Sequence, residues 1–357
     1  MSSKLDLFIN EFRKIKKSYN FDVVDVHVHP FDVMGVIHFS DHKTIDAQRF
    51  DKLDISPNAL ERLRFGPIVN LFAEIFCRLT PKQVNNEIKN SFTNVNTARI
   101  ITEMDQSLVD HCFLVPIEPW SRTIDITRSF RNKRFSYVGS IDIQAIKEGN
   151  IEATICRMKE ELNIVGLKLH PNLQNFYPQP RMNKNDIANK LHKILSITSK
   201  LKLFLMIHGG RSFFTNQMDT RYGQRFRGKD NGLLVNFIDQ GGESELFSSY
   251  RMPIIICHAA HYGALSFDSE RIDLIRRKYP NVFFDTAGTS PKVILKMLRL
   301  VGYKRIVFGS DALYNSMMFN LLFLFRATRI YARRTQRFED ALSRICSLNI
   351  KKITRQY

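Results

Sequence analysis

The chain has 357 residues, of which 44% are hydrophobic and 25% are charged. This composition is typical of globular proteins and excludes disordered and collagen-like chains. The 53 lysines and arginines outnumber the 35 aspartates and glutamates, which gives a formal net charge of +18. A charge of this size can attract nucleic acid, anionic lipid or acidic substrates. Because the basic residues are spread along the chain, we interpret the charge mainly as a property of a solvated surface.

The sequence carries no sign of secretion or of a membrane span. Residues 1–20 lack the apolar core of a secretory signal and instead predict an amphipathic helix. The apolar stretch 316–325 contains Asn320 and ends at Arg326, well short of the roughly 20 residues that cross a bilayer. The five cysteines are scattered and show no CxxC spacing, so neither a disulfide framework nor a cysteine zinc site is predicted. We therefore expect a cytoplasmic protein that does not bind membranes.

Eight short β-rich runs alternate with stretches of helical periodicity along most of the chain. The runs are residues 23–29, 111–117, 134–142, 164–170, 201–208, 252–259, 281–288 and 305–312. Strands that alternate with helices form parallel sheets through crossover connections. The number of strands favours a closed (β/α)8 TIM barrel, an α/β fold, over an open doubly wound sheet.

Two segments lie outside this repeat. Residues 31–97 form an insertion after the first strand, with a helical pattern around residues 58–79, and two more helical segments follow at about 315–334 and 338–354. We interpret residues 1–357 as a single domain with this insertion and extra C-terminal helices. Active sites of such barrels lie at the carboxyl ends of the strands, so we expect the insertion to form a lid or wall over the site.

Two histidines end the first strand, in the sequence VVDVHVHP. Side chains alternate along a strand, so His27 and His29 point the same way and can present two imidazoles to one metal ion. An HxH pair is weak evidence alone, but four more predicted strands close on polar residues. These residues are Lys168, His170, His208, His258 and Asp311. A barrel would gather them at one rim, which predicts a metal site.

With these residues the sequence resembles the amidohydrolase superfamily. The similarity is to the amidohydrolase-2 branch, the metal-dependent hydrolases and decarboxylases related to aminocarboxymuconate-semialdehyde decarboxylase. It covers nearly the whole chain from Phe21 and rests on DVHVHP, GLKLHP, MIHGG, ICHAAH, FFDTAG, FGSDA and a closing helix that contains Asn349. The order of these motifs is specific for the superfamily and much less specific for the reaction.

The resemblance implies a ligand set for one divalent metal ion. In that branch the ion, usually zinc, is held by the HxH pair, the strand-five histidine and the strand-eight aspartate. The corresponding residues here are His27, His29, His208 and Asp311. Three imidazoles and a carboxylate suit zinc, with manganese or iron as alternatives. Such an ion lowers the pKa of bound water toward about 7, and the resemblance implies that His258 and Asp311 handle the proton.

The role of Lys168 depends on how many metal ions bind. In binuclear members the strand-four lysine is carboxylated and bridges two ions, whereas in mononuclear members it is an ordinary amine. We expect one ion, so that Lys168 binds a substrate carboxylate or carbonyl oxygen. The alternative is a salt bridge with Asp25 or Asp285. His170 either faces the site or braces its loop.

Three further expectations concern residues around the site. We expect Asp285 to support His258 from behind, or to serve the structure only. We expect Cys257 to point away from His258, toward the helices. The loop after the fifth strand contains four arginines, which indicate either a small anionic substrate or a solvated loop. They are Arg211, Arg221, Arg225 and Arg227, of which Arg211 is the predicted substrate-binding residue.

Several functions are compatible with these residues. Hydrolysis of an amide, ester or lactone comes first because it is common in the superfamily, and non-oxidative decarboxylation is the alternative with the same ligands. A nuclease is less favoured, because deoxyribonucleases on this barrel carry a strand-four glutamate in the region of Lys168. A non-catalytic basic binding protein is less favoured because every ligand position is filled. We therefore expect a small-molecule substrate rather than nucleic acid; a homodimer is compatible with the resemblance.

Overall fold

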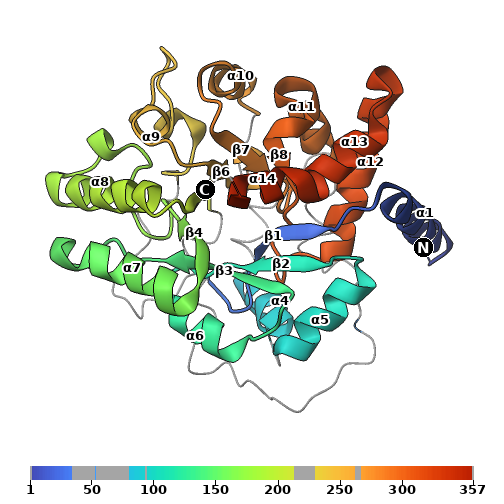
Figure 1. Ribbon diagram of the computed structural model, residues 1–357, viewed down its shortest axis with the longest axis horizontal. Helices are drawn as coiled ribbons and strands as arrows, with labels where there is room; N and C mark the ends of the chain where they lie inside the picture. The colour runs from blue at the N-terminus through green and yellow to red at the C-terminus, as the bar shows by residue number, and fades with distance from the viewer. Residues whose placement is uncertain are drawn as a thin grey trace.

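The computed structural model describes residues 2–33, 53, 80–92, 95–212, 230–261 and 267–355. Eight parallel strands pair in chain order from β1 to β8 and form a nearly closed barrel with helices around it (Figure 1). The predicted (β/α)8 TIM barrel is therefore confirmed. Most of the predicted 31–97 insertion, including the helical pattern around residues 58–79, lies outside the described residues.

Each strand falls within one of the predicted β-rich runs and is shorter than that run. The strands are β1 (Val24–Val28), β2 (His111–Leu114), β3 (Phe135–Ser140), β4 (Ile164–Leu169), β5 (Phe204–Ile207), β6 (Ile254–Ile256), β7 (Val282–Asp285) and β8 (Ile306–Val307). Strands β6 and β8 are the most curtailed, because the backbone turns into left-handed conformations soon after them, at His258 and at Asp311. These turns carry the polar residues of the strand ends.

The helices of the barrel lie between the strands, and further helices lie at both ends of the chain. They are α1 (Ser2–Tyr19), α4 (Pro81–Phe92), α5 (Thr97–Gln106), α6 (Thr123–Ser129), α7 (Ile151–Leu162), α8 (Asn185–Lys200), α9 (Glu245–Ser248), α10 (Ser269–Lys278), α11 (Pro291–Val301), α12 (Met317–Thr335), α13 (Phe338–Ser343) and α14 (Asn349–Arg355). The predicted helices at 1–20, 315–334 and 338–354 correspond to α1, α12 and the α13–α14 region.

The starts of these helices follow from local sequence. The side chain of Ser316 accepts a hydrogen bond from the N–H of Phe319 at the start of α12, and Ser290 does the same for Val293 at the start of α11. Such caps satisfy N–H groups that have no partner within the helix. Pro291 occupies the first turn of α11, where its missing N–H costs nothing.

The core has two layers. Val26, Phe204, Ile255 and other strand residues pack together in one cluster, and the remaining apolar side chains fill the layer between the strands and the helices. The ring of Phe204 lies over Gly166, where any β-carbon would come within 2.5 Å of it. Ile350 and Ile353 of α14 join the strand cluster, and α14 lies across the strands in Figure 1. The last helix thereby closes one end of the barrel.

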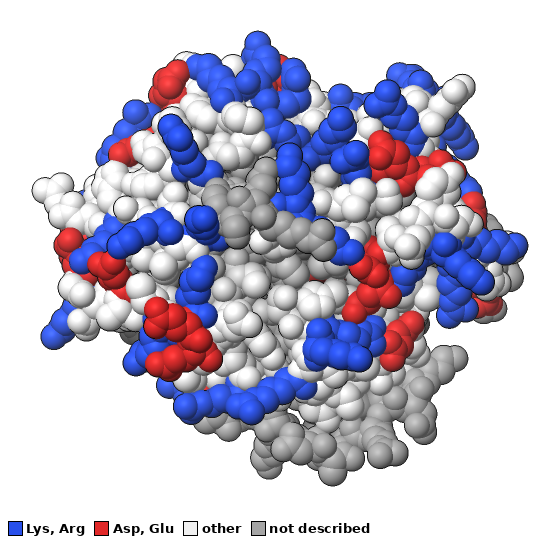
Figure 2. Space-filling view, viewed as in Figure 1, with Lys and Arg blue, Asp and Glu red and all other residues white. Residues whose placement is uncertain are grey.

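The positive charge is distributed over the face of the molecule that Figure 2 shows. Figure 2 shows lysine and arginine side chains spread over the visible face among acidic ones, rather than gathered into one block. Several are neutralised locally, such as Lys278 by Glu243 and Arg344 by Asp340. Within the described ranges, no helix is both long and apolar enough to cross a membrane.

The closing helix generates a stability prediction. The side-chain amide of Asn349 is buried and donates to the carbonyl oxygens of Tyr303 and Ile306, each at 2.7 Å. Asn349→Ala should lower the free energy of unfolding by about 2–4 kcal/mol, because two buried carbonyl groups lose their partner. Urea unfolding measures the change. The control Asn10→Ala, at an exposed position of α1, should change it by less than about 0.5 kcal/mol; equal effects of the two substitutions would contradict the prediction.

Candidate metal centre

Three side chains converge where β1 and β8 end. The Nε2 atoms of His27 and His29 lie 3.1 Å apart. Oδ1 of Asp311 lies 3.9 Å from Nε2 of His27 and 3.5 Å from Nε2 of His29. All three residues are buried, and their donor atoms lie within 4.8 Å of one another. The structure thus brings together three of the four predicted metal ligands.

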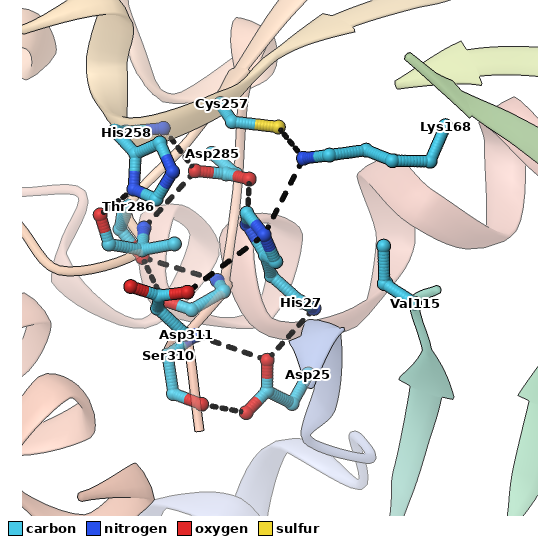
Figure 3. Close-up of polar contacts among 12 residues, drawn as sticks. Asp25, His27, Val115, Lys168, Cys257, His258, Asp285, Thr286, Ser310 and Asp311 are labelled. Atoms are coloured by element: carbon cyan, nitrogen blue, oxygen red, sulfur yellow. Dashed lines mark hydrogen bonds and ion pairs between the residues drawn. The ribbon is translucent and has the colours of Figure 1, made fainter. Parts of the chain in front are cut away.

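The other ring nitrogen of His27 and of His29, Nδ1, already forms a hydrogen bond within the protein. Nδ1 of His27 lies 2.9 Å from Oδ2 of Asp285 (Figure 3), and Nδ1 of His29 lies 2.7 Å from the carbonyl oxygen of Val115. Carboxylate and carbonyl oxygens only accept hydrogen bonds, so both Nδ1 atoms donate. In the neutral rings, both Nε2 atoms therefore carry lone pairs.

The surroundings keep both rings neutral. Burial is the main cause and the nearby Lys168 the next; together they lower the pKa of His29 to about 3 and that of His27 well below its usual value. Two lone pairs and a carboxylate oxygen therefore face one another, an arrangement that a cation stabilises. Zinc bonds of 2.0–2.1 Å in tetrahedral geometry place donor atoms about 3.3 Å apart. The separations in this structure fit such an ion.

Asp311 reaches this group through an unusual backbone conformation. Its φ is +66°, a left-handed conformation that aspartate tolerates better than most residues. Its N–H donates to the carbonyl oxygen of His27 at 2.9 Å, and its Oδ2 accepts a hydrogen bond from Nδ2 of Asn315 at 2.9 Å. One carboxylate oxygen is thus held by Asn315, while the other faces the histidines.

His258 lies on the other side of His27, with ring centroids 5.0 Å apart. Its N–H donates to Oδ1 of Asp285 at 2.6 Å, and its Nδ1 donates to the carbonyl oxygen of Ala287 at 2.9 Å. Burial, followed by the neighbouring His208 and His27, lowers its pKa well below the usual value. The ring is therefore neutral, with its proton on Nδ1.

Asp285 forms hydrogen bonds with more groups than the sequence predicted. It accepts from the backbone of His258 as well as from the ring of His27, and its Oδ1 also accepts the N–H of Ala287 at 3.1 Å. Hydrogen bonds of this kind fix the orientation of metal-binding histidines.

His208 is close to this group but is not part of the converging donor atoms. Its ring stacks on that of His170, with centroids 3.9 Å apart, and lies 4.8 Å from that of His258. Two groups of potential ligands occur among the described residues, His27 with His29 and Asp311, and His27 with His258 and Asp285. Neither includes His208, so metal binding by His208 stays a prediction.

His170 was expected either to face the site or to brace its loop, and it does both. Its Nδ1 accepts a hydrogen bond from the N–H of Leu173 at 3.2 Å, which holds the turn after β4, while its ring lies against His208. Arg211 donates to Oδ1 of Asp230 at 2.6 Å. The other arginines of the loop, Arg221, Arg225 and Arg227, lie outside the described residues.

Lys168 is completely buried beside the histidines. Its Nζ lies 2.9 Å from Sγ of Cys257 and 3.4 Å from Nε2 of His27 (Figure 3). The alternative of a salt bridge with Asp25 or Asp285 is not formed in the described part of the chain. The contact also corrects the expected orientation of Cys257, whose thiol faces Lys168. Cys257 keeps the strand alternation and packs in the same inner cluster as Ile255; His258 departs from that alternation, because the backbone becomes left-handed there.

Sequence reasoning gave no role to two polar pairs at this site. Asp25, considered only as a partner for Lys168, accepts hydrogen bonds from Ser310, and burial raises the pKa of its carboxyl to about 7. Tyr314 donates to Oδ1 of Asp32 at 2.5 Å, and its ring lies 5.9 Å from that of His29. Asp25 could have been found, because it precedes His27 by two residues on the same face; Tyr314 is marked by no local pattern.

Comparison with known proteins places this site in context. The family model described as amidohydrolase matches residues 134–330, more than half of the chain. A search of curated proteins gave no match.

Solved structures share the fold at low sequence identity. The 5-carboxyvanillate decarboxylase of Sphingomonas paucimobilis has a TM-score of 0.54 and 17% identity, over 94% of this chain and 99% of that chain. The 2,6-dihydroxybenzoate decarboxylase of Rhizobium has a TM-score of 0.50 and 16% identity, over 76% and 92%. The 5-carboxyvanillate decarboxylase of Novosphingobium aromaticivorans, complexed with manganese and 4-hydroxy-3-methoxy-5-nitrobenzoic acid, has a TM-score of 0.56 and 14% identity, over 94% and 97%.

The donor geometry predicts which substitutions remove metal. His27→Ala and Asp311→Ala should lose the ion, because each removes a converging donor atom, whereas His258→Ala should keep it. Asp285→Asn should weaken metal binding about 10- to 100-fold by releasing the ring of His27. Metal content by plasma mass spectrometry and chelator competition measure these effects. The control His192→Ala, at a half-exposed position of α8, should bind like wild type; full occupancy in His27→Ala would refute the ligand assignment.

The buried histidines predict a pH dependence for the metal-free protein. Because their folded-state pKa values lie below the unfolded value of about 6.5, the unfolded chain takes up protons that the folded chain does not. Stability should therefore fall as the pH drops from 7.5 to 5.5, with each histidine contributing up to about 1.4 kcal/mol per pH unit. Five buried histidines have lowered pKa values, namely His27, His29, His170, His208 and His258, and burial also lowers the pKa of the half-buried His111.

Two buried acids and one half-buried acid oppose this trend. Asp25, Glu103 and Glu118 have raised pKa values, mainly because of burial, and so favour the folded state as the pH falls. They are outnumbered, and the net slope should keep the sign set by the histidines. Urea unfolding in the presence of a chelator at pH 7.5, 6.5 and 5.5 measures it. Constant or rising stability toward pH 5.5 would contradict the assignment of neutral histidines.

Proposed function

We propose that this chain, which belongs to the amidohydrolase family, is a metal-dependent enzyme that removes a carboxyl group from a small organic acid without oxidation. The bond between the carboxyl carbon and the rest of the acid breaks, a proton takes its place, and carbon dioxide leaves. The observation that carries this proposal is the buried amine of Lys168 beside three converging metal-ligand atoms.

The surroundings of Lys168 favour an anionic substrate. The side chain is fully buried, and the partners that the structure gives its Nζ atom, Cys257 and His27, are not anions. Burial of an ammonium group is costly unless an anion accompanies it. A substrate carboxylate would supply that anion, and its oxygens could reach both Lys168 and the neighbouring metal site.

His27, His29 and Asp311 would hold the ion, with His208 as the expected fourth ligand. A divalent cation in this position supplies Lewis acidity toward a substrate oxygen. Zinc is the first expectation for this donor set. Manganese is the second, and the decarboxylase of Novosphingobium that shares the fold was solved with manganese.

The remaining groups can position the substrate and move a proton. Asp311 is fixed by Asn315 through Oδ2, so its Oδ1 keeps a constant orientation toward the histidines. His258 is fixed through Nδ1, and its ring lies 5.0 Å from that of His27, where an imidazole can hold a proton next to the substrate. Either group could deliver the proton that replaces the carboxyl group.

Decarboxylation precedes hydrolysis here because of the aromatic acid decarboxylases that share the fold. It also makes direct use of a substrate carboxylate bound by Lys168. We therefore place decarboxylation before hydrolysis. The sequence alone gave the opposite order, only because hydrolysis is common in the superfamily. By the same similarity, we propose hydroxylated benzoates with an additional carboxyl group as the first substrates to test.

Hydrolysis of an amide, ester or lactone remains the second candidate. The neutral His258 favours it, because an uncharged imidazole beside the metal site can accept a proton from water. An anionic lactone or amide would still find its counter-charge at Lys168. The two reactions therefore share a site and differ in whether a carboxyl carbon leaves the substrate.

The test uses protein loaded with zinc or with manganese and a panel of hydroxylated aromatic acids and carboxylated lactones. Decarboxylation predicts release of carbon dioxide from the acids, while hydrolysis predicts ring opening of the lactones. Lys168→Met should weaken binding of a nitro-substituted benzoate about 10- to 100-fold, as expected for loss of a charge-assisted hydrogen bond. The control Lys190→Met alters a buried lysine of α8 that pairs with Asp186, and should leave binding unchanged.

The outcomes separate the alternatives. Ring opening without carbon dioxide release would replace decarboxylation by hydrolysis. Unchanged benzoate affinity in Lys168→Met would overturn the anion-binding role of Lys168.

A further inference from the structure

The pairing between β1 and the segment that follows β8, which together carry three proposed metal ligands, is irregular. Strand β8 ends at Val307, yet the following residues still contact β1. Val26 donates to the carbonyl oxygen of Phe308 at 3.0 Å, Asp311 donates to that of His27 at 2.9 Å, and Val28 bridges to Ala312. A regular ladder cannot continue through this segment because Asp311 is left-handed.

The carboxylate of Asp25 supplies hydrogen-bond acceptors where this strand pairing is interrupted. Its Oδ1 accepts the N–H groups of His27 and Ser310, both at 3.0 Å. Its Oδ2 accepts the hydroxyl of Ser310 at 2.5 Å (Figure 3), and that hydroxyl in turn accepts the N–H of Ala312 at 3.1 Å. Asp25 and Ser310 are both completely buried. One side chain therefore satisfies backbone donors of two segments that a regular ladder would otherwise pair.

We propose that Asp25 and Ser310 are positioning residues that set the spacing between the HxH histidines and Asp311 for one metal ion. Asp25 binds the backbone of His27 itself, and Ser310 immediately precedes Asp311. The pair thus joins the two backbone segments whose side chains supply the donor atoms. The inference rests on the proposed metal-dependent function and adds to it the residues that determine metal affinity.

The choice of a carboxylate supports a role beyond packing. Burial of a carboxyl group is costly, and the three hydrogen bonds that Asp25 accepts offset that cost only while both segments keep their positions. Loss of the Ser310 hydroxyl would loosen the segment before Asp311 while leaving both backbone N–H groups in place. The distances of 3.5 and 3.9 Å from Oδ1 of Asp311 to the histidines would then no longer be fixed.

The experiment measures metal affinity separately from folding. Ser310→Ala should weaken zinc binding about 10- to 100-fold, the range for groups that orient metal ligands, with the metal-free protein still folded. Affinity is measured by competition with a chromophoric chelator, and folding by circular dichroism and thermal unfolding. Asp25→Asn is the second variant and should weaken binding at least as much, because an amide places a donor against N–H or O–H groups.

Thr198→Val is the matched control. Thr198 is also completely buried, and its hydroxyl donates to the carbonyl oxygen of Ile194 at 2.6 Å within α8. Its loss should reduce stability and leave zinc affinity unchanged. Wild-type zinc affinity in Ser310→Ala, together with reduced stability, would show that the pair is merely structural and overturn the inference alone. Failure of the wild type to bind zinc or manganese would overturn the proposed function and the inference with it.

Discussion

The Nε2 atoms of His27 and His29 face each other at 3.1 Å without a proton between them. Each ring donates its only N–H elsewhere, to Asp285 and to the carbonyl oxygen of Val115. Oδ1 of Asp311 adds a third electron pair to the same space. This concentration of lone pairs is unfavourable in a buried site unless a cation shares it, and the surrounding structure serves to maintain it.

The barrel holds these donor atoms in place with irregular backbone at the ends of two strands, β6 and β8. Strand β8 has two residues and β6 has three, and left-handed backbone follows each of them, at Asp311 and at His258. These backbone conformations set the directions of the Asp311 and His258 side chains, which in a continued strand would follow the regular alternation between the two faces. The backbone groups freed in this way find side-chain partners instead, Asp25 for β8 and Asp285 for β6. The buried carboxylates of Asp25 and Asp285 thereby satisfy backbone N–H groups at the C-terminal ends of these strands.

The sequence predicted the parts of the molecule that depend on local patterns. The strands follow from β-rich runs between helical periods, and the convergence of His27, His29 and Asp311 follows from their places at strand ends. The orientation of Cys257 was predicted wrongly, because residue types do not reveal left-handed backbone at His258. The bond between Asp32 and Tyr314 joins residues 282 positions apart, and no motif marks either partner. The full ligand set, with His208, remains a prediction.

The contacts of Asp285 also disfavour a metal ion held by His27, His258 and Asp285. A second group of donors, His27 with His258 and Asp285, lies beside the first. However, Oδ2 of Asp285 already accepts the N–H of His27, and its Oδ1 accepts two backbone N–H groups. The ring of His27 has one nitrogen lone pair, on Nε2, and this atom faces Nε2 of His29 and Nζ of Lys168. An ion in the second group would have to break the hydrogen bonds that hold His27 in the first, so the two groups compete and the first is the better site.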